Sequence, residues 1–345
     1  MRVLKRILPV MVLLAVMLAA IGVLLPRHAQ VERAIEIAAP PANVFTVLDN
    51  FHVFGKWSPW TGHDDPDAHT IYNETWSGVG AHLDWQRTAP EPDNGSAAIV
   101  ESLPYRRIAM RLALDDRRPM AVAFTLSPTA NGTRVVWHAD TDFGWNLAAR
   151  FLGLLPDNHL GDALARGLEN LKRLVEVLPQ ADLGGADIRL IRMQPVSIVY
   201  VNGHTTTDGR DVANALDTAY AEVRRFVAAN RLEVTGAPMA LTRLWDPAHN
   251  RYEFEAALPV DWKQLAQPAG SPVKLGQTLG GRVVMARWVG PYSGTGRVYD
   301  QIAAWLAANG LVATGLYWEQ YPNSPATTPD DKLVTLIYTP VKAAP

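Results

Sequence analysis

Residues 219–236, AYAEVRRFVAANRLEVTG, recur at residues 298–315 as VYDQIAAWLAANGLVATG. The two stretches align at a constant offset of 79 positions, the difference between Tyr220 and its match Tyr299. In each copy an alternating apolar segment precedes this helical stretch and two more follow it, so the pattern predicts a duplicated strand-helix-strand-strand unit. Because neither copy alone can cover its sheet, we expect the two to form one domain with a pocket at their pseudo-twofold seam.

The second copy continues into GLYWEQYPNSP, residues 315–325. Read as a strand, this segment places Tyr317, Glu319 and Tyr321 on one face, and the position aligned with Glu319 in the first copy is Ala240. A carboxylate between two tyrosine rings is a candidate cation receptor, since each ring adds about 0.5–2 kcal/mol of cation–π attraction. The alternative from spacing alone is a solvated acid on an edge strand, paired with a nearby lysine.

The N-terminus carries an uncharged apolar run over residues 7–25, preceded by Arg2, Lys5 and Arg6. Nineteen helical residues span roughly 28 Å, which is enough to cross a bilayer. We therefore expect residues 1–28 to form a membrane anchor or signal segment, with a single span and the bulk of the chain extracytoplasmic, on the periplasmic side. The alternative is cleavage near Ala20 and secretion to the periplasm.

Residues 31–178 predict a separate α+β domain. A strand and two short helices precede a series of short strands with turn residues between them. The domain ends in a long helix whose apolar stripe recurs at spacings of three and four, at Leu160, Leu164, Leu168, Leu171, Val175 and Leu178. Residues 179–186 are expected to link this domain to the duplicated domain over residues 187–343.

The composition excludes several classes of partner and of chemistry. The 345 residues have a net charge of −2 and no basic run beyond the first six positions, so we expect no nucleic-acid partner. The chain has no cysteine, which excludes disulfides and thiolate chemistry. The acidic stretch HDDPDAH, residues 63–69, is interpreted as a loop rather than a metal site, and we expect neither a metal nor another cofactor.

The first domain resembles the polyketide-cyclase-like branch of the SRPBCC (START-like, helix-grip) superfamily. The stretches that carry the resemblance are VERAIEIAAPPANVFTVLDNFHVFGKWSPW, RPMAVAFTLSP, GTRVVWHAD and LARGLENLKRLVE. The resemblance implies a curved sheet around the long helix, with an apolar cavity that binds hydrophobic ligands. Four tryptophans are candidate cavity residues: Trp57, Trp60, Trp76 and Trp85. The alternative for any one of them is a place in the core.

The second domain resembles the GyrI-like small-molecule-binding domain, also found as the effector-binding domain of AraC- and MerR-type regulators. RWVGPYSG, TGAPMALTRLWD and YWEQYPNSPATTPDDKLVTLIYTPV carry this resemblance, together with the duplication. It implies an acidic residue near the centre of a pocket between the halves, which corresponds to Glu319. Tyr317, Tyr321, Tyr292 and Trp288 are the other candidate ligand-binding residues. The turn YPNSP departs from the family's usual acidic turn, so ligand preference does not transfer automatically.

We therefore expect a membrane-anchored extracytoplasmic protein that binds hydrophobic or cationic amphiphilic small molecules, as a sensor, scavenger or carrier. No catalytic residue set is visible, and binding without turnover is the favoured interpretation. The alternative is a hydrolase or cyclase acting on hydrophobic electrophilic compounds, with Glu319 as the acid–base residue.

Overall fold

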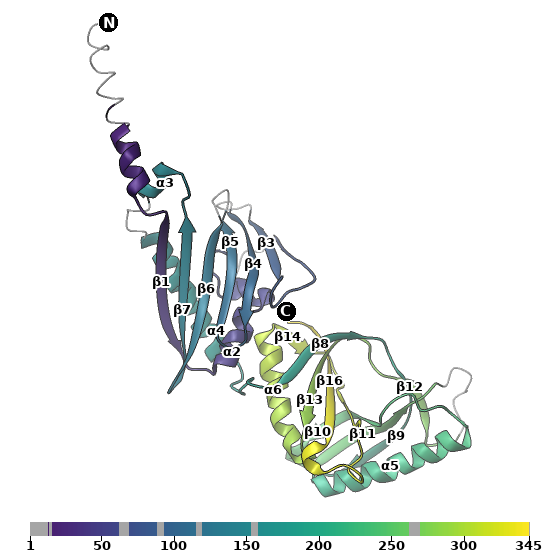
Figure 1. Cartoon of the computed structure of the whole chain (residues 1–345). Helices are drawn as coiled ribbons and strands as arrows, with labels where there is room; N and C mark the ends of the chain where they lie inside the picture. Colours follow the sequence, from purple (N-terminus) through teal and green to yellow (C-terminus); the bar gives the residue numbers. More distant parts are fainter. Residues whose placement is uncertain are drawn as a thin grey trace, which may run out of the picture. The chain divides into compact units, whose positions relative to one another are not determined.

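The computed structural model describes residues 13, 16–61, 69–87, 93–114, 119–152, 158–261 and 270–344. The chain divides into two compact units, Met1–Gly184 and Gly185–Pro345. Each unit is built on one antiparallel sheet with few helices (Figure 1), which confirms the α+β class predicted from the sequence.

The first unit wraps a seven-stranded sheet around a long helix. Its strands pair in the order β1-β7-β6-β5-β4-β3-β2. The strands are β1 (His28–Ile37), β2 (His69–Tyr72), β3 (His82–Arg87), β4 (Asp93–Leu103), β5 (Arg107–Leu114), β6 (Met120–Thr129) and β7 (Gly132–Asp142). The helices are α2 (Pro41–Leu48), the 3-10 helix η1 (Phe51–Lys56), α3 (Leu147–Leu152) and α4 (Asn158–Glu176).

The helix α4 supplies the centre of this unit's core. Leu164, Leu168, Leu171 and Val175 are each at most 2% exposed, so the apolar stripe predicted from the sequence faces the sheet. Gly167 lies where the ring of Trp137 meets the helix, and a Cβ there would come within 2.6 Å of that ring. The absence of a side chain at this position allows the tryptophan to pack directly on the helix backbone.

The second unit holds the repeat. The first copy runs β9 (Ser197–Thr205), α5 (Gly209–Ala229), β10 (Met239–Asp246) and β11 (Arg251–Pro259). The second runs β13 (Gly281–Val289), α6 (Thr295–Ala308), β15 (Trp318–Gln320) and β16 (Val334–Ala343). Shorter elements complete it: β8 (Asp187–Met193), β12 (Lys274–Gln277), β14 (Leu311–Ala313), and the 3-10 helices η2 (Pro247–His249), η3 (Tyr292–Gly294) and η4 (Asp330–Lys332).

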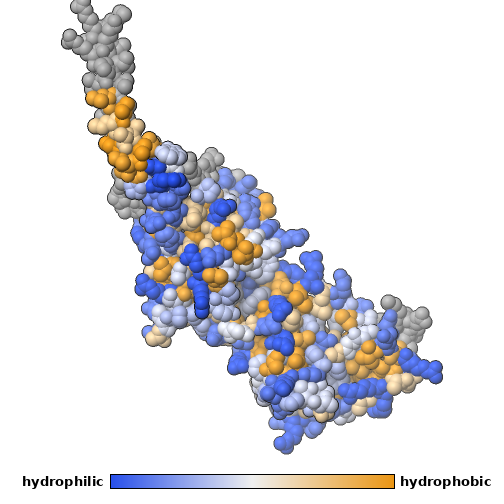
Figure 2. Space-filling view, viewed as in Figure 1, coloured by the Kyte–Doolittle hydropathy of each residue, from blue (hydrophilic) through white to orange (hydrophobic). Residues whose placement is uncertain are grey.

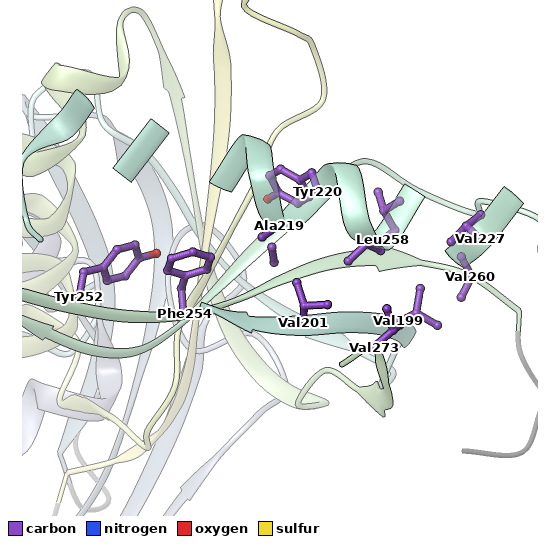
Figure 3. Packing of buried hydrophobic residues seen from close by; sticks show 12 residues of the cluster. Val199, Val201, Ala219, Tyr220, Val227, Tyr252, Phe254, Leu258, Val260 and Val273 are labelled. Atoms are coloured by element: carbon purple, nitrogen blue, oxygen red, sulfur yellow. The ribbon is translucent and has the colours of Figure 1, made fainter. Parts of the chain in front are cut away.

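The strands of the second unit form one sheet in the order β12-β9-β11-β10-β15-β16-β13-β8. One face has two apolar clusters, one against α5 around Val223 and Ala256, and one against α6 around Ile302 and Ile337. Figure 3 shows the first of these, with α5 lying across the strands and its side chains directed onto them. A third cluster, which contains Trp318, covers the opposite face of the sheet.

The N-terminal segment forms a helix over residues 16–24, which precedes β1 in the sequence. Its apolar side chains are exposed (Figure 2), among them Val16, Val23 and Leu24 at 61%, 51% and 84%. Within the described residues, no helix is both long enough and apolar enough to cross a membrane. The expected span over residues 7–25 lies partly outside the described residues, because residues 1–12, 14 and 15 are not among them.

The end of this helix is fixed to the first unit by one buried side chain. Arg150 is 4% exposed and sits on α3, which the sequence did not predict. Its guanidinium donates hydrogen bonds to the backbone carbonyls of Gly22, Val23 and Leu25 at 3.0–3.3 Å. A cation at this point satisfies carbonyls that a helix end leaves without partners and also offsets the negative end of the helix dipole.

Candidate functional site

Glu319 lies in the interior of the sheet. It is the middle residue of β15, which pairs with β10 on one side and with β16 on the other. The neighbouring Trp318 is 1% exposed on the opposite face, where its ring stacks on Tyr338 at 5.3 Å. The alternation predicted for this strand is therefore present, and the alternative of a solvated edge strand is wrong.

A row of directly paired residues places Glu319 between the two helices. Ala256 pairs with Ala240, Ala240 with Glu319, and Glu319 with Ile337. Paired residues in an antiparallel sheet share a face, so all four side chains lie on the helix-covered face. Ala256 belongs to the cluster under α5 and Ile337 to the cluster under α6, which leaves Glu319 at the seam between the copies.

The pseudo-twofold axis of the repeat passes beside Glu319. With the offset of 79, Ala240 and Glu319 are equivalent positions, and the register pairs them directly with each other. The flanking pairs cross between the copies in the same symmetric way: Met239 with Gln320, and Leu241 with Trp318. Only the residues at an axis face their own equivalents, so one half contributes a carboxylate there and the other a methyl group.

Two tyrosine hydroxyls hold the carboxylate. Tyr299, on α6, donates to Oε1 of Glu319 at 2.5 Å, and Tyr321, just after β15, donates to Oε2 at 2.6 Å. No basic side chain forms an ion pair with Glu319 within the part of the chain that the structure describes. The carboxylate is thus oriented by neutral donors and keeps further lone pairs available.

Four more tyrosines complete what we call the tyrosine cluster, defined as Tyr220, Tyr252, Tyr292, Tyr299, Tyr317 and Tyr321 around Glu319. Burial raises the pKa of each of these phenols, and the negative charge of Glu319 raises each pKa further. All six phenols are therefore neutral hydrogen-bond donors at physiological pH.

The rings and hydroxyls of the cluster also contact each other. Tyr299 meets Tyr317 edge-to-face at 5.2 Å, and Tyr292 meets Tyr321 in the same way at 5.5 Å. Tyr252 and Tyr317 both hydrogen-bond the side chain of the buried Thr242. The predicted set of Glu319, Tyr317, Tyr321 and Tyr292 is therefore brought together.

Trp288, the fifth residue predicted for this site, has a different position. Its indole nitrogen donates to the carbonyl of Pro291 at 3.0 Å, and Arg297 lies over its ring at 5.2 Å. A Cβ at Gly290 or at Gly294 would come within 2.8 Å of this ring. Trp288 thus packs into the turn that carries Tyr292, and no direct contact between Trp288 and Glu319 is observed among the described residues.

The four tryptophans predicted to line a cavity in the first unit separate into two groups. Trp57 and Trp85 are 1% and 3% exposed and belong to the core, while Trp60 and Trp76 are half-buried. Trp60 packs on Trp137 at 5.4 Å, and Trp76 lies beside His52 at 5.3 Å. A role for these tryptophans in ligand binding stays a prediction.

Sequence reasoning missed several polar groups. Tyr299, Tyr252 and Thr242 reach Glu319 or its neighbours from three different elements, and only the match of Tyr299 to Tyr220 in the repeat singled one of them out.

In the first unit, burial raises the pKa of Asp49 to about 6, although hydrogen bonds from Ser102 and Gly78 act to lower it. The acidic stretch HDDPDAH, residues 63–69, lies outside the described residues except for His69, the first residue of β2. Among the described residues no group of His, Asp and Glu is placed to hold a metal.

These features define a two-unit α+β protein whose second unit is a duplicated domain with one carboxylate at its axis. Family profiles match the units separately. The profile for polyketide cyclase/dehydrase and lipid transport proteins matches residues 28–176, and the profile for the GyrI-like small-molecule-binding domain matches residues 186–342. The chain is therefore a fusion of an SRPBCC-like domain and a GyrI-like domain, and the resemblance seen in the sequence is confirmed.

Solved structures similar to this chain include the C-terminal domain of EcmrR, with 16% identity, 46% of this chain and 99% of that chain covered, and a TM-score of 0.40. A hydrolase from Listeria innocua has 17% identity, 45% and 91% coverage, and a TM-score of 0.35. A protein from Chromobacterium violaceum has 18% identity, 43% and 98% coverage, and a TM-score of 0.33. No curated protein matches the chain.

Proposed function

We propose that the second unit binds cationic amphiphilic small molecules at Glu319, without catalysing their conversion. The observation that carries this proposal is the environment of the carboxylate. Both of its oxygens accept hydrogen bonds from neutral phenols, and no described basic group neutralises its charge. An uncompensated carboxylate in a partly desolvated setting attracts a cation far more strongly than it would in water.

The rings of the tyrosine cluster add to this attraction. A cation above a tyrosine ring gains about 0.5–1 kcal/mol when exposed and about 2 kcal/mol when desolvated. Because all six phenols stay neutral, the charge of the cluster is that of Glu319 alone. The site is therefore matched to a single positive charge attached to an apolar or aromatic body.

The test uses the full chain reconstituted in phosphatidylcholine nanodiscs. Small molecules are titrated into it, and calorimetry measures their binding. Benzyltrimethylammonium, benzyl alcohol and benzylsulfonate share one ring and differ in charge. We expect the cation to bind most tightly, and Glu319→Gln to weaken its binding about tenfold or more, which is roughly 1.4 kcal/mol. The substitution should change the binding of the uncharged benzyl alcohol and the anionic benzylsulfonate far less.

Glu233→Gln is the matched control, because it removes one exposed acid that follows the end of α5 and does not belong to the tyrosine cluster. A general electrostatic effect would weaken cation binding equally in both variants, and that result would contradict the proposal. Incubation with each bound compound followed by mass spectrometry tests the enzymatic alternative, since only catalysis converts the ligand.

We further propose that residues 7–25 anchor the protein in a membrane with both units on the extracytoplasmic side, where the first unit takes hydrophobic ligands. Three basic residues precede the apolar run, and the described part of the helix has exposed apolar side chains. Since the chain has no cysteine, single cysteines report topology directly. A membrane-impermeant maleimide applied to spheroplasts should label Glu233→Cys and leave Lys5→Cys unlabelled, whereas the reverse pattern would overturn the orientation.

A further inference from the structure

One buried hydroxyl of the tyrosine cluster has no hydrogen-bond partner among the described residues. Tyr220, on α5, is 6% exposed, and its hydroxyl forms no hydrogen bond with any described residue. In contrast, Tyr299 and Tyr321 bond to Glu319, and Tyr252 and Tyr317 bond to Thr242. A buried hydroxyl without a partner loses its hydrogen bonds to water and gains none in return, so this one requires an explanation.

The repeat explains why Tyr220 lacks an acceptor. Tyr220 is the equivalent of Tyr299, which donates to Glu319. The residue equivalent to Glu319 in the first copy is Ala240, which has no oxygen in its side chain. The same helix position therefore carries a donor in both copies, and only the second copy supplies the acceptor.

Tyr220 nevertheless belongs to the same site. It lies in the apolar cluster under α5, against which Tyr321 also packs. Figure 3 shows Tyr220 on the side of α5 that faces the sheet, with its hydroxyl toward the side where Tyr252 lies. Burial above all, and also the negative charge of Glu319, raise the pKa of Tyr220, as expected for a buried phenol near that carboxylate.

The two ends of the site differ in charge. The guanidinium of Arg224 lies over the ring of Tyr220, 5.6 Å from its centroid. A positive group there disfavours a second cation and favours a neutral or anionic acceptor for the Tyr220 hydroxyl. At the other end, the carboxylate of Glu319 favours a cation.

We propose that Tyr220 donates its hydrogen bond to an acceptor on the ligand, so that the site selects cations that also carry a carbonyl, ether or carboxylate oxygen. This inference rests on the proposed cation site at Glu319. The ligand class is then an amphiphile with one positive charge and, toward the Ala240 side of the axis, one hydrogen-bond acceptor.

Access to this hydroxyl requires a side chain to move, because the hydroxyl is sealed in the free protein. Tyr292 is the most exposed ring of the cluster at 37%, it lies on the short η3 turn, and it packs on Tyr321, which in turn packs against the apolar cluster that contains Tyr220. As the most exposed ring of the cluster, Tyr292 is the candidate for this movement.

The experiment uses phenyl ketones joined to a trimethylammonium group through one, two or three methylene groups. Each ketone is compared with the analogue in which a methylene replaces the carbonyl, so charge and length stay the same. We expect the full chain in nanodiscs to bind at least one ketone about five to ten times more tightly than its analogue, as a single hydrogen bond allows. Tyr220→Phe should abolish that preference and leave the binding of the analogue unchanged.

Tyr338→Phe is the matched control, because its hydroxyl bonds to Gln320 and its ring lies on the opposite face of the sheet. The preference for the ketone should persist in this variant. An equal preference in wild type and Tyr220→Phe, or no preference in wild type for any pair, would overturn the inference. If Glu319→Gln leaves the binding of every cation unchanged, the cation site itself is wrong, which is a separate result.

Discussion

In the second copy of the repeat, the hydroxyl of Tyr299 on α6 is bonded to Glu319, whereas in the first copy the hydroxyl of Tyr220 on α5 has no acceptor among the residues that the structure describes. The helices, the strand order and the positions of the two tyrosines correspond, and the difference arises at one pair of residues on the axis. The comparison teaches that duplication sets the geometry of the site, while the departure from symmetry gives its two ends different chemistry.

The strongest test of this comparison removes the same atom from both copies. Tyr299→Phe takes away a donor to a partly buried carboxylate and should lower the free energy of unfolding of the second unit by about 1–3 kcal/mol. Tyr220→Phe removes a hydroxyl that has no partner, so stability should stay the same or rise by up to about 1 kcal/mol. Hydrogen exchange in urea, read from peptides of β15 and β16, measures both.

Equal losses in the two variants would show that Tyr220 has a bonded partner in the free protein. Such a result would remove the asymmetry on which the comparison depends. Tyr338→Phe again serves as the reference for the loss of a phenol hydroxyl elsewhere in the same sheet.

A smaller effect is expected at Asp49, which extends the comparison to a carboxyl of the first unit. Its pKa is raised from 3.8 to about 6, so between these values the folded state binds more protons than the unfolded state. Stability contributed by this group is therefore present at low pH and falls as the pH rises from about 4 to 6. A shift of this size corresponds to about 3 kcal/mol at most, and solvent screening of the half-buried group reduces it to about 1–2 kcal/mol.

Asp49→Asn keeps an acceptor for Ser102 and cannot ionise. We expect this variant to lose the pH-dependent decline between pH 4 and 6 and to be the more stable protein at pH 7. Hydrogen exchange in β4 and β5 reports the first unit, and Asp162→Asn on the exposed side of α4 is the control. An unchanged pH profile in Asp49→Asn would mean that other groups cause the decline.

The sequence predicted the features that depend on regular spacing. The apolar stripe of α4, the alternation of Trp318 and Glu319, and the equivalence of Ala240 and Glu319 all follow from fixed periods of 3.6, 2 and 79 residues. These periods put Glu319 on the face opposite Trp318 and matched it to Ala240, whereas its place between the copies was implied by the family resemblance.

The rest depends on contacts between elements that are distant in sequence. Thr242 and Tyr252 lie on neighbouring strands, and their link to Tyr317 requires the actual register of the sheet. Residue type also does not separate a cavity wall from a core, because both place aromatic residues on the inner side of the unit, as with Trp57 and Trp85. The bond between Arg150 and the N-terminal helix arises from the six-residue α3, too short for a periodic signal.

The axis between Ala240 and Glu319 has an evolutionary consequence. A homodimer built from two separate copies of this repeat would be encoded by one gene and would carry the same residue on both sides of its axis. Two glutamates paired there would repel each other, and two alanines would leave no charge for a cation. Joining the copies in one chain lets each side of the axis mutate independently, so a single carboxylate can face a methyl group in one site.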